Sequence, residues 1–72
     1  GQPRFAYVHA VALQSADRLD EALAVLDGAH RRHPGNAEVL AALVSFNRDA
    51  GRLDAARVYA GRLQQSRGVP AQ

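Results

Sequence analysis

Apolar residues recur at helical spacing in four segments of this chain, and short polar turns separate the segments. The first predicted helix runs from about Arg4 to Ser15, and the second from Leu19 to about His33. The third runs from Ala37 to about Asp49, and the fourth from Asp54 to about Ser66. The pattern therefore predicts an all-α chain with a tail over residues 67–72 that lacks periodicity and should fray.

The same spacing indicates which side chains face the core of each predicted helix. The first helix should bury one face, on which a histidine interrupts the apolar series. We expect that histidine, His9, to be packed and hydrogen-bonded rather than a ligand. The recurring positions are Phe5, Ala6, Val8, His9, Ala12 and Leu13 in the first helix, Ala22, Leu23, Leu26 and Ala29 in the second, and Leu40, Leu43, Val44 and either Phe46 or Asn47 in the third.

Residues that commonly begin or end helices lie at the ends of the predicted helices. Asp20 and Glu21 place negative charge in the first turn of the second helix, where the backbone amides are unpaired. That helix ends in the polar or cationic run 30–33, and Pro34 with Gly35 then stops it. Gly51 provides the permissive backbone for the turn between the third and fourth helices.

The chain also repeats itself at a spacing of 34 residues. The segment Ala16-Asp17-Arg18-Leu19-Asp20-Glu21-Ala22 returns as Ala50-Gly51-Arg52-Leu53-Asp54-Ala55-Ala56. This period and the small residues at these positions are similar to those of the tetratricopeptide repeat family, whose unit is a pair of helices. Its small crossing residues match Ala22, Ala29, Ala50 and Ala56, and its closing proline matches Pro34.

The resemblance implies two antiparallel helix-turn-helix hairpins stacked as a short right-handed α-solenoid. The first repeat would cover about residues 3–36 and the second about 37–66, within one domain over residues 1–72. At the repeat spacing, Gly1 and Gln2 fall on Gly35 and Asn36, so we expect the chain to begin just past an earlier unit, although Gly1 could equally be a cloning remnant. All nine basic residues are arginine, which suggests a bacterial genome of biased composition.

The resemblance further implies a protein-interaction module that binds a peptide on the concave face of its first and third helices. A terminal carboxylate clamp of Lys, Arg and Asn would fall on Tyr7, Val11, Glu38 and Ala42, so that clamp is absent. We expect an extended or helical peptide instead, with apolar contacts to Tyr7 and Val11 and acidic groups at Arg4 and Arg48. Alternatively, these residues are ordinary exposed positions or a covered face. The implied face comprises Arg4, Tyr7, Val11, Gln14, Ser15, Glu38, Ala41, Ala42, Ser45, Arg48 and Asp49.

The composition of the chain argues against several other classes of function, namely metal binding through cysteine, catalysis, nucleic-acid binding and membrane insertion. The absence of cysteine excludes disulfides and thiolate metal sites, and no arrangement of nucleophile and base indicates an enzyme or a cofactor. His30 and His33 could share a metal, but the helix end explains them more simply. A net charge of +2 predicts no nucleic-acid partner, and no apolar run predicts a membrane span.

Two alternatives to peptide binding stay open at this point. Arginines on the second and fourth helices could form a basic patch for nucleic acid, with Tyr59 as the one aromatic residue for stacking. The pair of repeats could instead be a structural segment that self-associates as a closed dimer, because two repeats leave uncovered an apolar face that should carry some of Phe5, Val8 and Ala12. It could also end a longer array, and some such arrays are attached to multihaem cytochromes. The arginines concerned are Arg31, Arg32, Arg57, Arg62 and Arg67.

Overall fold

The computed structural model describes residues 2–66, which form four helices in an all-α arrangement. The helices are α1 (Pro3–Ser15), α2 (Leu19–Arg32), α3 (Ala37–Asp49) and α4 (Leu53–Ser66). Each bound lies within one residue of its predicted position, so the helix predictions are confirmed. The predicted fraying of residues 67–72 falls outside the described residues.

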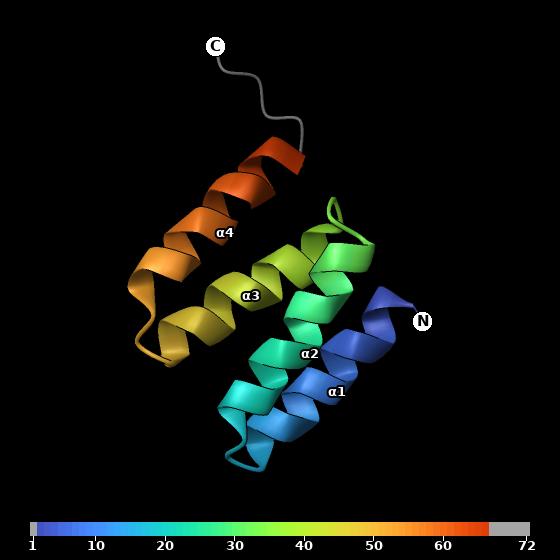
Figure 1. Ribbon diagram of the computed structural model, residues 1–72, viewed down its shortest axis with the longest axis vertical. Helices are drawn as coiled ribbons and strands as arrows, with labels where there is room; N and C mark the ends of the chain where they lie inside the picture. The colour runs from blue at the N-terminus through green and yellow to red at the C-terminus, as the bar shows by residue number, and fades with distance from the viewer. Residues whose placement is uncertain (1, 67–72) are drawn as a thin grey trace.

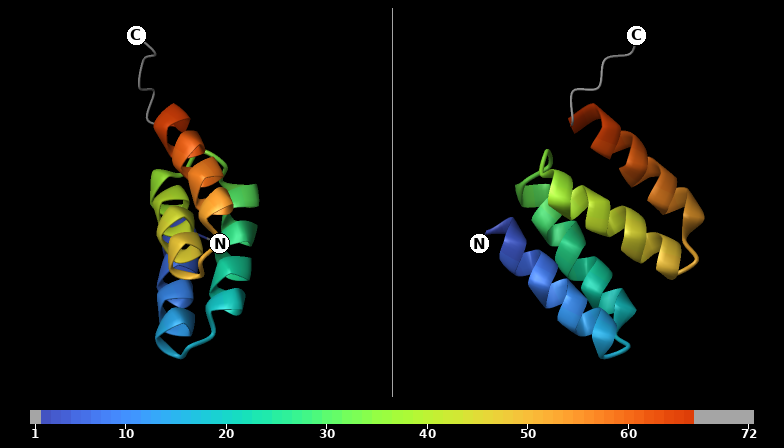
Figure 2. Two further views of the ribbon diagram at one scale, coloured as in Figure 1. Left: turned by 90° about the vertical axis from the view of Figure 1, so that its left-hand side faces the viewer. Right: turned by 180° about the vertical axis from the view of Figure 1, so that it is seen from behind.

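The helices follow one another as two hairpins, α1 with α2 and α3 with α4 (Figure 1). Helix α3 is the joining element, because it packs against α1, α2 and α4. Seen from the side, α1 and α3 lie in one layer, and α2 lies to one side of that layer (Figure 2). The first and third helices therefore share a face, as the sequence predicts.

The core is built from α2 and α3, with one buried side chain each from α1 and α4. The predicted stripe of α2 is confirmed, since all four of its residues are buried. In α3 both Phe46 and Asn47 are buried, whereas Val44 is only half-buried. The buried apolar residues are Ala10, Ala22, Leu23, Leu26, Ala29, Val39, Leu40, Ala42, Leu43, Phe46 and Ala56.

Four of the six α1 residues that recur at helical spacing are exposed, and the predicted packing of His9 is wrong. Phe5 and Val8 are 69% and 59% exposed, and His9 and Ala12 are exposed as well. The helix instead turns Ala10 into the core, beside positions such as Ala6 and Leu13, which are half-buried. Apolar spacing marked two adjoining faces of α1, and the hairpin covers only one of them. His9 is therefore a surface residue and not a packed core histidine.

The turns inside the two hairpins have the same hydrogen bonds. The amide of Arg18 donates to the carbonyl of Leu13 at 2.8 Å, and the amide of Arg52 donates to the carbonyl of Asn47 at the same distance. Both turns need one residue with a left-handed backbone, which is Asp17 at φ 63° in the first and Gly51 at φ 77° in the second. The backbone conformation of the turn therefore repeats every 34 residues, like the sequence. The turn predicted at Gly51 is confirmed.

Polar groups fix the starts of α2 and α3 in different ways. The side chain of Asn36 accepts a hydrogen bond of 2.9 Å from the amide of Val39, an N-cap that satisfies one of the free amides of α3. At the start of α2, Arg18 instead donates to Glu21 in the first turn. That hydrogen bond, and then the attraction between the two charges, raises the pKa of Arg18. The guanidinium of Arg18 is charged at any physiological pH with or without this shift.

Three of the four small residues that match the repeat pattern are buried. Ala22 and Ala29 are 0% and 1% exposed, and Ala56 is buried in α4. Ala50 is half-buried at the end of α3, and Pro34 lies exposed in the turn between the hairpins. Alanine at the buried positions lets neighbouring elements approach closely, because any longer side chain needs space that the packing does not provide.

We expect Ala22→Leu to lower the free energy of unfolding by about 1 to 3 kcal/mol, because the longer side chain overpacks the core. Ala24→Leu is the matched control on the same helix, since Ala24 is exposed, and it should change that free energy by no more than about 0.5 kcal/mol. Urea denaturation followed by circular dichroism measures both values. Equal midpoints for Ala22→Leu and the wild type would show that the site has room for the larger group.

Two glycines that lie in open space should respond to alanine with opposite signs. A Cβ atom at Gly51 or at Gly61 would meet nothing within 4 Å, so only the backbone decides the effect. Gly51→Ala should destabilise the fold by about 1 to 2 kcal/mol, because its positive φ disfavours a side chain. Gly61→Ala should stabilise it by about 0.5 to 1 kcal/mol, because Gly61 lies inside α4. Thermal melts of the two variants provide the comparison, and a shift of the same sign in both would contradict the expectation.

Candidate functional site

A hollow of about 240 Å³ lies between α1 and α3 on the face that these two helices share. Tyr7 forms the α1 side, and all the other lining residues come from α3. Successive turns of α3 reach the hollow because the positions recur at helical spacing. The lining residues are Tyr7, Glu38, Ala41, Ala42, Ser45 and Phe46.

Small side chains keep this hollow open, and aromatic ones give it apolar walls. Ala41, Ala42 and Ser45 occupy the α3 surface without filling the space next to it. Tyr7 is half-buried and packs against the core, while Phe46 is 5% exposed. An apolar side chain of a ligand would therefore contact firmly held walls, and the hydroxyl groups of Tyr7 and Ser45 provide hydrogen-bonding groups there.

Polar contacts join α1 and α3 at both ends of the hollow. The Nε of Arg4 lies 3.8 Å from the Oε1 of Glu38, and the Nε2 of Gln14 donates to the Oδ2 of Asp49 at 3.1 Å. The Arg4 side chain is 77% exposed, so this ion pair adds little to stability. It does direct Arg4 toward a carboxylate of the chain itself. Arg48, by contrast, is exposed and has no acidic partner among the described residues.

The structure brings some of the predicted binding residues together and separates others. Five of the predicted residues line one hollow: Tyr7, Glu38, Ala41, Ala42 and Ser45. Arg4 and Gln14 flank it through the contacts with α3. Three predicted residues neither line the hollow nor make these flanking contacts. Val11 is half-buried against the core, and Ser15 and Arg48 are exposed.

A second groove, which the sequence did not predict, lies between α2 and α4. No Cα atoms of these two helices come within 8 Å of each other, so side chains span the gap. The Nη2 of Arg52 donates to the Oδ1 of Asp20 at 2.9 Å across it. The groove has a volume of about 400 Å³ and is lined by Asp20, Leu23, Ala24, Asp27, Leu43, Asn47, Arg52, Ala55 and Tyr59.

Three side chains connect the C-terminal part of α2 to α4 next to that groove. His30 is 9% exposed, and its Nε2 lies 3.0 Å from the Nη1 of Arg62. The His30 ring meets the Tyr59 ring edge to face at 5.6 Å, and the Arg62 guanidinium lies 5.3 Å from the centre of the Tyr59 ring. Arginine can only donate, so the Nε2 of His30 is the acceptor in this contact. His30 is thus a packing residue between helices, in addition to ending α2.

Two further classes of site can be checked on the described part of the chain. Residues 2–66 contain no group of three or more His, Cys, Asp or Glu side chains placed to hold a metal ion. Within the same range, no helix has both the length and the apolar character needed to cross a membrane.

The comparisons with known proteins agree with the architecture. The sequence pattern of the family described as Tetratricopeptide repeat matches residues 13–68, which is more than half of the 72-residue chain. No curated protein and no solved structure matches the sequence. The matched residues include both turns with a left-handed residue and the buried alanines of α2 and α4. The chain therefore belongs to the tetratricopeptide repeat family.

Proposed function

We propose that this chain is a non-enzymatic interaction module that binds a peptide segment of a partner protein along the shared face of α1 and α3. Tetratricopeptide repeats as a family mediate protein–protein interactions, and they are typically not enzymes. The observation that carries the proposal for this chain is the hollow beside Tyr7, with its open floor of small residues. In this reading the two repeats, residues 3–36 and 37–66, act as one binding domain.

The shape of the hollow supports an apolar anchor on the ligand. Tyr7 and Phe46 are held by the core, so they lose little conformational freedom when a ligand binds. The alanines between them allow a ligand backbone or a medium-sized side chain to approach α3 closely. A segment with an apolar residue at this point would cover the part of the Tyr7 side chain that is still exposed.

The charges on the face support an acidic residue near the anchor. Glu38 faces Arg4, and Asp49 accepts from Gln14, so both carboxylates already have partners within the chain. Arg48 is the exposed cation of this face that has no acidic partner among the described residues. A carboxylate of the ligand would supply that partner, so we favour a segment that combines apolar and acidic side chains.

The nucleic-acid alternative has less support. Arg31 pairs with Asp27 at 3.3 Å, and Arg62 is held by His30 and Tyr59. The Tyr59 ring, the one aromatic group considered for base stacking, already contacts His30 and Arg62. Arg67, also considered for the basic patch, lies outside the described residues. These contacts favour a protein ligand over a polynucleotide.

The proposal can be tested with two sets of short synthetic peptides that share their apolar positions and carry either acidic or basic residues between them. The acidic set should bind more tightly, and Arg48→Glu should weaken its binding about fivefold, because an exposed ion pair contributes up to about 1 kcal/mol. Arg57→Glu is the matched control, since Arg57 is an exposed arginine on α4. Titration calorimetry gives the affinities for both variants.

The location of binding is a separate readout of the same experiment. Amide chemical shifts of the labelled full chain should change on α1 and α3 when the acidic peptides are added, most strongly around Tyr7 and Ser45. Changes confined to α2 and α4, or equal losses for Arg48→Glu and Arg57→Glu, would contradict the proposal.

A further inference from the structure

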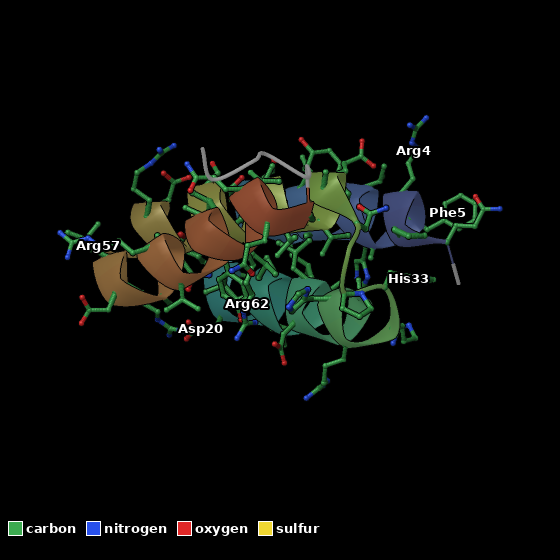
Figure 3. The ribbon with its side chains drawn as sticks, turned by 90° about the horizontal axis from the view of Figure 1, so that it is seen from above. Arg4, Phe5, Asp20, His33, Arg57 and Arg62 are labelled. Carbon is green, nitrogen blue, oxygen red and sulfur yellow. The ribbon has the colours of Figure 1, made fainter. Side chains whose placement is uncertain are left out.

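The outer face of α1 is an apolar surface that no described part of the chain covers. It comprises Phe5, Val8 and Ala12, which recur at helical spacing and are all exposed. Phe5 is 69% exposed and Val8 is 59% exposed, and the Phe5 ring lies at the edge of the molecule (Figure 3). Single exposed apolar residues are ordinary, but three on one stripe of a short helix form a patch.

The second hairpin indicates what such a stripe does when it has a partner. At the 34-residue spacing, Phe5, Val8 and Ala12 correspond to Val39, Ala42 and Phe46 of α3, which are 0%, 4% and 5% exposed. In α3 this stripe is buried in the packing with the other helices. The same stripe on α1 is thus suited to pack against a helical surface.

The far end of the molecule is a poor match for that stripe. Leu23 and His30 of α2 are buried in the fold. The residues 34 positions later, on α4, are Arg57 and Gln64, and both are exposed. Stacking α1 of one copy on α4 of another would bring these polar groups against Phe5 and Val8. Burying them without partners costs free energy, so head-to-tail stacking is disfavoured.

The outer face of α1 is, in contrast, compatible with itself. The first turn of α1 has no acidic residue and its last turn has no basic residue. Two copies of α1 in antiparallel orientation place the N-terminus of each helix, with the exposed Arg4, beside the C-terminal carbonyl groups of the other. This arrangement opposes the two helix dipoles favourably, places Phe5 of each copy near Ala12 of the other, and brings the two Val8 side chains near the two-fold axis.

We propose that the outer face of α1, defined as Phe5, Val8 and Ala12, binds the same face of a second copy of this chain in an antiparallel, two-fold pair. A closed two-fold contact uses one patch twice and stops at the dimer. A single pair of short helices buries less than the roughly 1,200 Å² of a stable interface, so the association should be weak and dependent on concentration. The hollow beside Tyr7 lies on a different face of α1, so this inference does not depend on the proposed peptide binding.

Sedimentation equilibrium of the full chain over a concentration series tests the dimer. The mass should rise from 7.7 kDa toward twice that value and then level off. Val8→Glu should keep the mass at the monomer value, whereas Val58→Glu should dimerise like the wild type. Val58 is the matched control because it is a valine on α4 that is 52% exposed, similar to Val8. Circular dichroism establishes that both variants stay folded.

Three results of that experiment would overturn the proposal. A mass that stays at 7.7 kDa at every concentration would mean that water covers the outer face of α1. A mass that grows beyond the dimer would indicate head-to-tail stacking. Equal effects of Val8→Glu and Val58→Glu would mean that general surface hydrophobicity, rather than this face, drives association.

Cysteine cross-linking tests the two-fold geometry, because the chain has no cysteine of its own. Val8 lies near the middle of the exposed stripe, so Val8→Cys should form a disulfide-linked dimer under mild oxidation at concentrations where the wild type associates. Val58→Cys should remain mostly monomeric under the same conditions. Cross-linking of the two variants to the same extent would contradict the antiparallel α1 pair.

Discussion

The burial of α3 is the interaction on which the rest of this structure depends. Leu40 and Leu43 are 0% and 1% exposed, and α3 packs against each of the other three helices. Fully burying a leucine is worth about 1.5 to 3 kcal/mol, a large share of the stability of a chain this short. The hollow beside Tyr7 exists because α3 is fixed in this position: its core side holds the helices together, and its Ala41 side faces the hollow.

Much of the fold could be predicted from the sequence because the repeat sets local geometry. A period of 34 residues places a left-handed turn residue, Asp17 or Gly51, and a buried alanine, Ala22 or Ala56, at equivalent points. Helix bounds follow from these local features. Part of the candidate site could be predicted from the family resemblance, which assigns Tyr7 and Ser45 to the face that the first and third helices share.

The exposed face of α1 and the contacts between α2 and α4 could not be predicted in this way, because they depend on which helices lie next to one another. Apolar spacing cannot tell a face that a neighbour covers from one that has no neighbour, so Phe5 looks like a core residue in sequence and is exposed in the structure. The contacts of His30 with Tyr59 and Arg62 join residues about 30 positions apart, on helices that the chain does not connect directly. No local pattern contains that information, and α3 determines it by setting the positions of both helices.

The gap between α2 and α4 has a mechanical consequence. Side chains such as Arg52 and Arg62 cross it to reach Asp20 and His30, while the two backbones stay apart. Long arginine side chains can extend or rotate with little loss of energy, so they resist a change in the angle between the hairpins far less than a packed interface does. The packing of α2 against α3 therefore sets the angle between the hairpins, and the side chains that cross between α2 and α4 add little resistance to a change in it.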